Sequence, residues 1–104
     1  MGPRRVAMYG TVFRYRVQPG KEAEVERVIE QFLADPPEGF VDAWTYRLDA
    51  GGNEYITAAA HVSRESYVEN SQSPAQAEWF ASFRALLEAD PEWSDGEIVH
   101  GKPH

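Results

Sequence analysis

The chain of 104 residues contains no cysteine. This absence excludes a disulfide framework, a thiolate nucleophile and the cysteine-based metal sites, and it makes the cytoplasm the expected compartment. Basic residues are also scarce, because 10 Lys and Arg stand against 17 Asp and Glu and leave a formal net charge of −7. Nucleic acids and anionic membranes bind basic surfaces, so neither is expected as a partner, and a small molecule or another protein is favoured.

Long apolar runs and metal-ligand spacings are missing as well. No apolar run follows Arg4 and Arg5, so neither a signal peptide nor a membrane span is expected. His61 lies far from His100 and His104 in the sequence and no His-x-His pair occurs, so no metal site is predicted. The sequence also lacks a glycine-rich phosphate loop and a nucleophile elbow.

The apolar residues that are present suffice for one core, since they make up 42% of the chain, with 12% aromatic. We therefore expect one domain over 1–104, with its core at about 7–100 between a short N-terminal extension and a C-terminal tail. Alternation predicts strands over 7–17, 39–48, 54–62 and 96–100, and apolar stripes predict helices over 21–34 and, in two pieces, over 63–89. This order predicts a ferredoxin-like α+β fold, an antiparallel four-stranded sheet with its helices on one face.

Both faces of the predicted sheet carry apolar residues. Phe40, Trp44, Tyr46 and Leu48 are expected on one side of the second strand, opposite Val41 and Ala43, and alanines line both sides of the third. A face that meets water should be polar. We therefore predict a homodimer through the open sheet face, forming a dimeric α+β barrel; the alternative is that the small alanines tolerate solvent.

Three stretches carry a resemblance to a known family: the run Val17–Glu22 after the first strand, the run Ala60–Tyr67, and Ser73-Pro74. Together with the layout of nearly the whole chain, they resemble the antibiotic biosynthesis monooxygenase-like family of dimeric α+β barrels. The resemblance implies a pocket between helices and sheet in each protomer. In the family's enzymes it implies oxygenation of polycyclic aromatic substrates or of haem, without a protein-held metal or flavin, so no cofactor is expected.

The haem-degrading branch of that family has an asparagine on the first strand, a tryptophan at the end of the third and a histidine in the second helix. Here the first two positions hold Phe13 and His61, and no histidine occurs between Ser63 and Pro91. Haem degradation is therefore not expected.

If a pocket lies under the helices, an aromatic box with few polar groups should line it. Its expected residues are Thr11, Phe13, Tyr15, Trp44, Thr57, Tyr67, Asn70, Trp79, Phe83 and Arg84. Such a box suits a small, flat aromatic ligand, although the same aromatics could simply form the core. Tyr67, Asn70 and Arg84 are candidates to stabilise a developing oxyanion, or are helix-surface residues.

His61 is the candidate catalytic residue. An imidazole titrates near neutral pH and could deprotonate a phenol, giving a carbanion-like species that reacts with oxygen. The alternative is a strand-end histidine bonded to backbone or solvent.

Three functions remain open from the sequence. The first is a cofactor-independent monooxygenase acting on a small aromatic or polyketide- or quinol-type compound, with His61 as base. The second is a non-catalytic dimeric module of the same fold, for ligand binding or stress. The third is a lactone isomerase-type enzyme using the same base. A cavity reaching His61 supports an enzyme, whereas a filled core opposes it.

Overall fold

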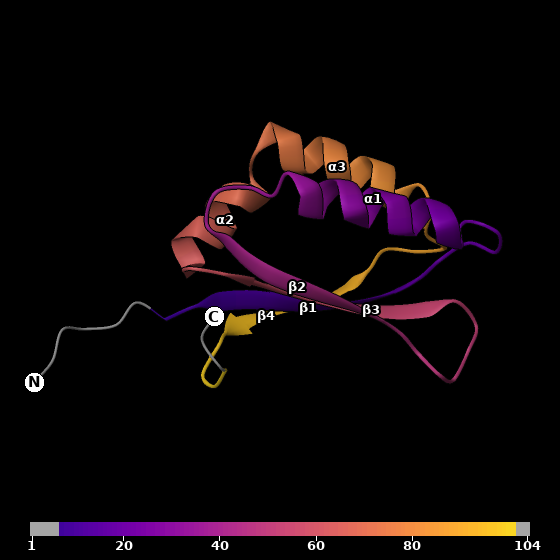
Figure 1. Ribbon diagram of the computed structural model, residues 1–104, viewed down its shortest axis with the longest axis horizontal. Coiled ribbons are helices and arrows are strands. Elements are labelled where there is room, and N and C mark those ends of the chain that lie inside the picture. Colours follow the sequence, from indigo (N-terminus) through magenta and orange to yellow (C-terminus); the bar gives the residue numbers. More distant parts are fainter. Residues whose placement is uncertain (1–6, 102–104) are drawn as a thin grey trace, which may run out of the picture.

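The computed structural model describes residues 7–101 of the chain (Figure 1). The elements follow in the order β1 (Tyr9–Arg16), α1 (Glu22–Ala34), β2 (Phe40–Arg47), β3 (Glu54–His61), α2 (Arg64–Ser71), α3 (Pro74–Arg84) and β4 (Glu92–Glu97). The strands form one antiparallel sheet in the order β2-β3-β1-β4. Helices α1 and α3 lie side by side over one face, and α2 lies near one end of that face. The predicted ferredoxin-like α+β fold is thus confirmed.

The two helix starts predicted after β3 are present. The Ser63 hydroxyl accepts the backbone N–H of Ser66 at 3.1 Å and caps α2. The Ser73 hydroxyl accepts the backbone N–H of Gln76 at 3.1 Å and caps α3, which has a proline in its first turn. Each cap satisfies an N–H that has no partner inside its helix.

The predicted end of the last helix and the predicted start of the last strand are both wrong, because the chain after α3 pairs with the end of β1. Helix α3 ends at Arg84 rather than near residue 89, and the backbone N–H of Gln18 and that of Glu88 bond the carbonyls of Leu86 and Arg16 at 2.9 Å each. This closure lets the next strand start at Glu92, so β4 covers Glu92–Glu97 and not 96–100. The position of β4 was missed because every residue of this strand is exposed and no apolar alternation marks it. The strand is held by its backbone pairing with β1.

The core lies between the sheet and the two covering helices. Alternation along β1 turns Thr11, Phe13 and Tyr15 inward, with Arg14 and Arg16 outward, as predicted. The central cluster consists of Phe13, Tyr15, Val17, Val25, Tyr55, Phe83 and Leu87.

A β-bulge near the start of β2 places Phe40 on the opposite face of the sheet from the one predicted. The register shifts between Phe40 and Asp42, so the Phe40 ring lies under the helices, with its centroid 5.3 Å from that of Phe32. Trp44 and Tyr46 point away from the helices and are 49% and 58% exposed. The expectation that Phe40 shares a side with Trp44 is therefore wrong, because the bulge adds one residue to the strand.

The sheet face turned away from the helices, here called the open face, carries Val12, Trp44 and Tyr46, all of them exposed. Arg14 and Arg16 form ion pairs with Glu54 on the same face. Among residues 7–101, no helix is long and apolar enough to span a membrane.

Candidate functional site

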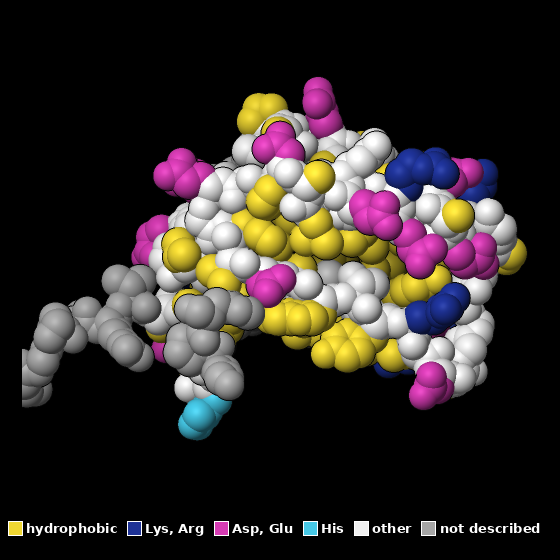
Figure 2. All heavy atoms as spheres, viewed as in Figure 1, with side chains coloured by type: hydrophobic (Ala, Val, Ile, Leu, Met, Phe, Trp, Pro, Cys, Tyr) yellow, Lys and Arg dark blue, Asp and Glu magenta, His cyan; other side chains and the backbone are white. Residues whose placement is uncertain are grey.

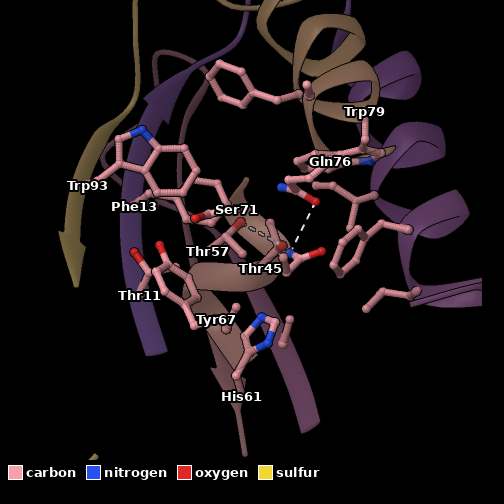
Figure 3. A pocket seen from close by; sticks show the side chains of 18 residues that line it. Thr11, Phe13, Thr45, Thr57, His61, Tyr67, Ser71, Gln76, Trp79 and Trp93 are labelled. Atoms are coloured by element: carbon pink, nitrogen blue, oxygen red, sulfur yellow. Dashed lines mark hydrogen bonds between the residues drawn. The ribbon is translucent and has the colours of Figure 1, made fainter. Parts of the chain in front are cut away.

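A cavity of about 550 Å³ lies between the sheet and the helices. Its size falls within the range of about 300–1,000 Å³ that small-molecule pockets occupy. Its walls consist of Thr11, Phe13, Ile29, Phe32, Leu33, Ala43, Thr45, Thr57, Ala59, His61, Tyr67, Asn70, Ser71, Gln76, Ala77, Trp79, Phe80 and Trp93 (Figure 3). On the side of the molecule drawn in Figure 2, hydrophobic side chains form a band between the helix layer and the sheet. The space under the helices is therefore not a filled core.

The cavity brings together most of the residues proposed from the sequence: Thr11, Phe13, Thr57, His61, Tyr67, Asn70 and Trp79. Tyr15 and Phe83 do not line it, because they are 3% and 0% exposed within the core. Trp44 lies on the open face. Arg84 is also outside: its Nε donates to Asp90 Oδ1 at 2.7 Å, so it offers the cavity no positive charge.

Sequence reasoning missed Trp93 and Gln76 as wall residues. Trp93 lies opposite Phe13 in the β1–β4 register, and the two rings stack with centroids 4.3 Å apart. It was missed because the last strand was expected several residues later; the proline just before Glu92 was the available signal for an earlier start. Gln76 was not among the expected pocket residues, whereas its side chain faces the cavity.

His61 ends β3 on the cavity wall and is 3% exposed. The Phe40 and Tyr67 rings meet it edge to face, with centroid distances of 5.8 and 5.4 Å. Its Nδ1 is buried and has no hydrogen-bond partner within the described part of the chain. Burial lowers the pKa of the His61 imidazole, because it disfavours the charged form. The imidazole is therefore neutral at neutral pH and can accept a proton.

Tyr67 lies beside His61 and reaches across to β4. Its hydroxyl donates to Asp95 Oδ1 at 2.9 Å. Burial, together with the neighbouring carboxylate, raises the pKa of Tyr67 to about 12. The phenol keeps its proton at any physiological pH, so Tyr67 is a neutral polar group and not a base.

The sheet below the cavity carries a chain of three hydroxyls, one from each of three strands. Tyr15 Oη lies 2.8 Å from Thr57 Oγ1, which lies 2.9 Å from Thr45 Oγ1. Burial raises the pKa of the Tyr15 phenol, so this chain also stays uncharged. The two threonines line the cavity and can hydrogen-bond a ligand oxygen.

Helices α2 and α3 contribute amides and an indole to the remaining wall. Asn70 Nδ2 lies 3.5 Å from Gln76 Oε1, which is a long and weak contact. Trp79 Nε1 donates to the carbonyl of Val28 at 3.1 Å, so this indole presents its ring alone. Aromatic walls with a few neutral polar groups suit a flat ligand whose oxygens are held in place.

No group of three or more His, Asp or Glu side chains within residues 7–101 could hold a metal ion. The chemistry that the described wall residues can perform themselves is proton transfer at His61 and hydrogen bonding by hydroxyls and amides.

Solved structures with the same architecture are known, although no family model and no curated protein matches the sequence. The class they define is the antibiotic biosynthesis monooxygenase-like fold, which this chain has.

Among the individual proteins, SnoaB, a cofactor-independent oxygenase from Streptomyces nogalater, superposes with a TM-score of 0.79 at 22% identity, covering 95% of this chain and 100% of its own. A candidate antibiotic biosynthesis monooxygenase from Caulobacter crescentus CB15 gives 0.79 at 19% identity, covering 91% and 92%. A conserved protein from Methanosarcina mazei Go1 gives 0.77 at 16% identity, covering 88% and 92%. At these identities the likeness establishes the fold.

Proposed function

We propose that the protein is a cofactor-independent oxygenase acting on a small, flat aromatic compound that carries a ring hydroxyl. The observation that carries this proposal is His61, a buried neutral imidazole on the wall of an aromatic cavity, whose Nδ1 has no hydrogen-bond partner among residues 7–101. Leaving a buried polar atom unpaired costs about 1–3 kcal/mol, which is unusual unless the atom has a task. Likeness in fold to SnoaB, a cofactor-independent oxygenase, supports the same reaction class.

The reaction begins with a proton transfer. His61 takes the proton of the ring hydroxyl, which leaves a phenolate, whose negative charge is shared with a ring carbon, beside an imidazolium. The anion gives one electron to dioxygen, and the two radicals join in a carbon–oxygen bond. The resulting peroxide takes the proton back from His61. Loss of water from this hydroperoxide breaks the O–O bond and the C–H bond at that carbon, so that the ring hydroxyl, one ring C–H and O2 become two ring carbonyls and H2O.

The chain's other wall residues bind and orient the substrate. Phe13, Trp79 and Trp93 provide flat apolar surface, and Thr45 and Thr57 provide hydroxyls on the sheet side. The anion and the imidazolium form together inside the cavity, so the step creates no net charge there.

The decisive experiment measures oxygen uptake on a panel of anthrones, naphthols and hydroquinones with wild type and His61→Gln. Gln keeps polarity and approximate size but cannot take up a proton, so a base role predicts a loss of about 100-fold or more in kcat/KM. His100→Gln, which changes an exposed histidine outside the cavity walls, is the matched control and should keep full activity. Equal rates in wild type and His61→Gln would remove His61 from the mechanism.

The same panel separates the other two functions. A binding module would bind these compounds without consuming oxygen. A lactone isomerase would convert lactones at the same rate under argon and in air. Either result would replace the oxygenase proposal.

We also propose that the protein forms a homodimer through the open face. Val12, Trp44 and Tyr46 expose apolar surface on a sheet whose other face is covered, and a second copy offers a matching surface. Ion pairs of Arg14 and Arg16 with Glu54 border this surface, so opposite charges are present for self-complementary contacts.

A further inference from the structure

One end of the cavity is built from three elements that meet beside His61. Thr11 comes from β1, Tyr67 from α2 and Asp95 from β4. Figure 3 shows Thr11 and Tyr67 close together, with His61 next to Tyr67. Asp95 lies opposite Thr11 in the β1–β4 register and accepts the Tyr67 hydroxyl, but it is exposed and does not line the cavity.

The protons at this end are already committed. Tyr67 has a single hydroxyl proton, and it goes to Asp95 Oδ1 at 2.9 Å. Thr11 also has a single proton, which can go to the neighbouring Tyr67 oxygen, whereas its contact with the Ser94 carbonyl at 3.5 Å is long and weak. An ionised carboxylate such as Asp95 can only accept. What remains for a ligand at Thr11 and Tyr67 is therefore oxygen lone pairs.

We propose that Thr11 and Tyr67, with Asp95 as positioning residue, form a subsite that recognises a hydrogen-bond donor, namely a free ring hydroxyl on the ligand. A hydroxyl donates to these lone pairs. An ether or carbonyl oxygen in the same place sets lone pair against lone pair and leaves both sides unsatisfied. Sites built to hydrogen-bond a substrate hydroxyl reject analogues that lack it.

The subsite gives the proposed oxygenase a preference for its substrate over its product, and on this point it rests on the proposed function. A hydroxyl that becomes a ring carbonyl turns from donor to acceptor, and its hydrogen bond to the subsite is lost. The oxidised compound then binds more weakly than the reduced one, which favours its release.

The test measures dissociation constants under argon by isothermal titration calorimetry with a naphthol, its methyl ether and the corresponding naphthoquinone. In wild type the naphthol should bind about three- to tenfold more tightly than either of the others, the value of one hydrogen bond. Equal binding of naphthol and ether would overturn the inference, and so would failure of all three compounds to bind.

Asp95→Asn tests the positioning role. The amide can donate to the Tyr67 oxygen and release the Tyr67 proton toward the cavity, so the preference for the naphthol should vanish or reverse toward the ether. Tyr67→Phe should reduce the preference to below about twofold, because a single hydrogen bond is removed. Asp90→Asn, the same change at an exposed aspartate paired with Arg84, is the control and should keep the wild-type ratio.

A ligand-free readout accompanies these variants. NMR titration of the tyrosine ring carbons should place the pKa of Tyr67 near 12 in wild type and lower in Asp95→Asn, because the carboxylate helps to raise it. An unchanged pKa and an unchanged ligand ratio in Asp95→Asn would refute the role of Asp95.

These binding measurements need no turnover, so the two proposals can fail separately. A naphthol preference without oxygen uptake leaves the subsite standing and refutes the oxygenase. Oxygen uptake that depends on His61, without any preference for the naphthol, supports the oxygenase and refutes the subsite.

Discussion

His61 combines two features that rarely occur together in a folded protein: it is buried, and its Nδ1 has no hydrogen-bond partner in the described part of the chain. Burial disfavours the charged form, so the imidazole is held neutral at neutral pH, which is the form in which a base acts. Its neighbour Tyr67 is held in the opposite condition, with a proton that it does not release. Adjacent aromatic residues on β3 and α2 thus have distinct roles, set by burial and by one carboxylate.

The lowered pKa of His61 predicts a dependence of stability on pH. The unfolded chain binds a proton at His61 near its ordinary pKa of 6.5, whereas the folded protein binds it only at lower pH. Between these values the unfolded state holds more protons, so the free energy of unfolding falls as pH drops below 6.5, by at most about 1.4 kcal/mol per unit. Urea unfolding from pH 7.5 to 5 should show this fall in wild type and in His100→Gln. The His61→Gln protein should show a shallower fall; parallel curves would contradict the assignment.

The candidate site was predictable where strand alternation decides which way a residue points. Alternation puts Thr11 and Phe13 on one side of their strand, the family resemblance implies a pocket under the helices, and the structure places both residues and His61 on its wall. Asp95 escaped detection because every residue of β4 is exposed, so no apolar pattern marks the strand. Arg84 was proposed for the cavity but pairs with Asp90 instead. This pair was not predictable, because Asp90 follows Arg84 by six residues, which is not the spacing of three or four that brings side chains together on a helix.

The loop before β2 fixes the position of α2, and with it Tyr67. Gly39 has φ of 87° and lies against the first turn of α2, where an added β-carbon would clash with the Ser66 side chain. The carbonyl of Gly39 also accepts the N–H of Val62 at 2.8 Å, which joins this loop to the end of β3. This approach was not predictable, because the sequence marked Gly39 only as the beginning of a strand.

Gly39→Ala is therefore expected to destabilise the protein by about 2–3 kcal/mol. The positive φ alone accounts for about 1–2 kcal/mol, and the contact with Ser66 adds to it. Gly51→Ala is the matched control, because its φ is 86° and its β-carbon would meet open space, so it should lose only the backbone contribution. Chemical denaturation of both variants measures the difference. Equal losses would show that the loop yields to the added methyl group.

The two faces of the sheet have different roles. The covered face holds the cavity, and the open face holds the exposed apolar residues, so one alternating pattern supplies both. The sequence predicted this division through the apolar character of both faces. It could not predict the bulge in β2, because a bulge depends on pairing between strands and leaves no mark in local periodicity.

The proposed dimer makes a prediction for the open face. Trp44→Glu places a charge at the centre of the expected interface, where burying it unpaired is unfavourable. Sedimentation equilibrium should give twice the chain mass of 11.7 kDa for wild type and a mass nearer one chain for the variant. Val99→Glu changes another exposed apolar residue, past the end of β4, and should sediment as wild type does. A monomeric wild-type protein would refute the dimer.

The arrangement of the aromatic residues also makes the molecule its own optical probe. The chain has 3 tryptophans, of which Trp79 and Trp93 line the cavity while Trp44 lies on the opposite side of the sheet. With Trp44 changed to Phe, all remaining indole emission originates next to a bound ligand. With Trp79 and Trp93 changed instead, the emission comes from the open face. Occupancy and self-association can therefore be followed by separate light signals without any attached dye.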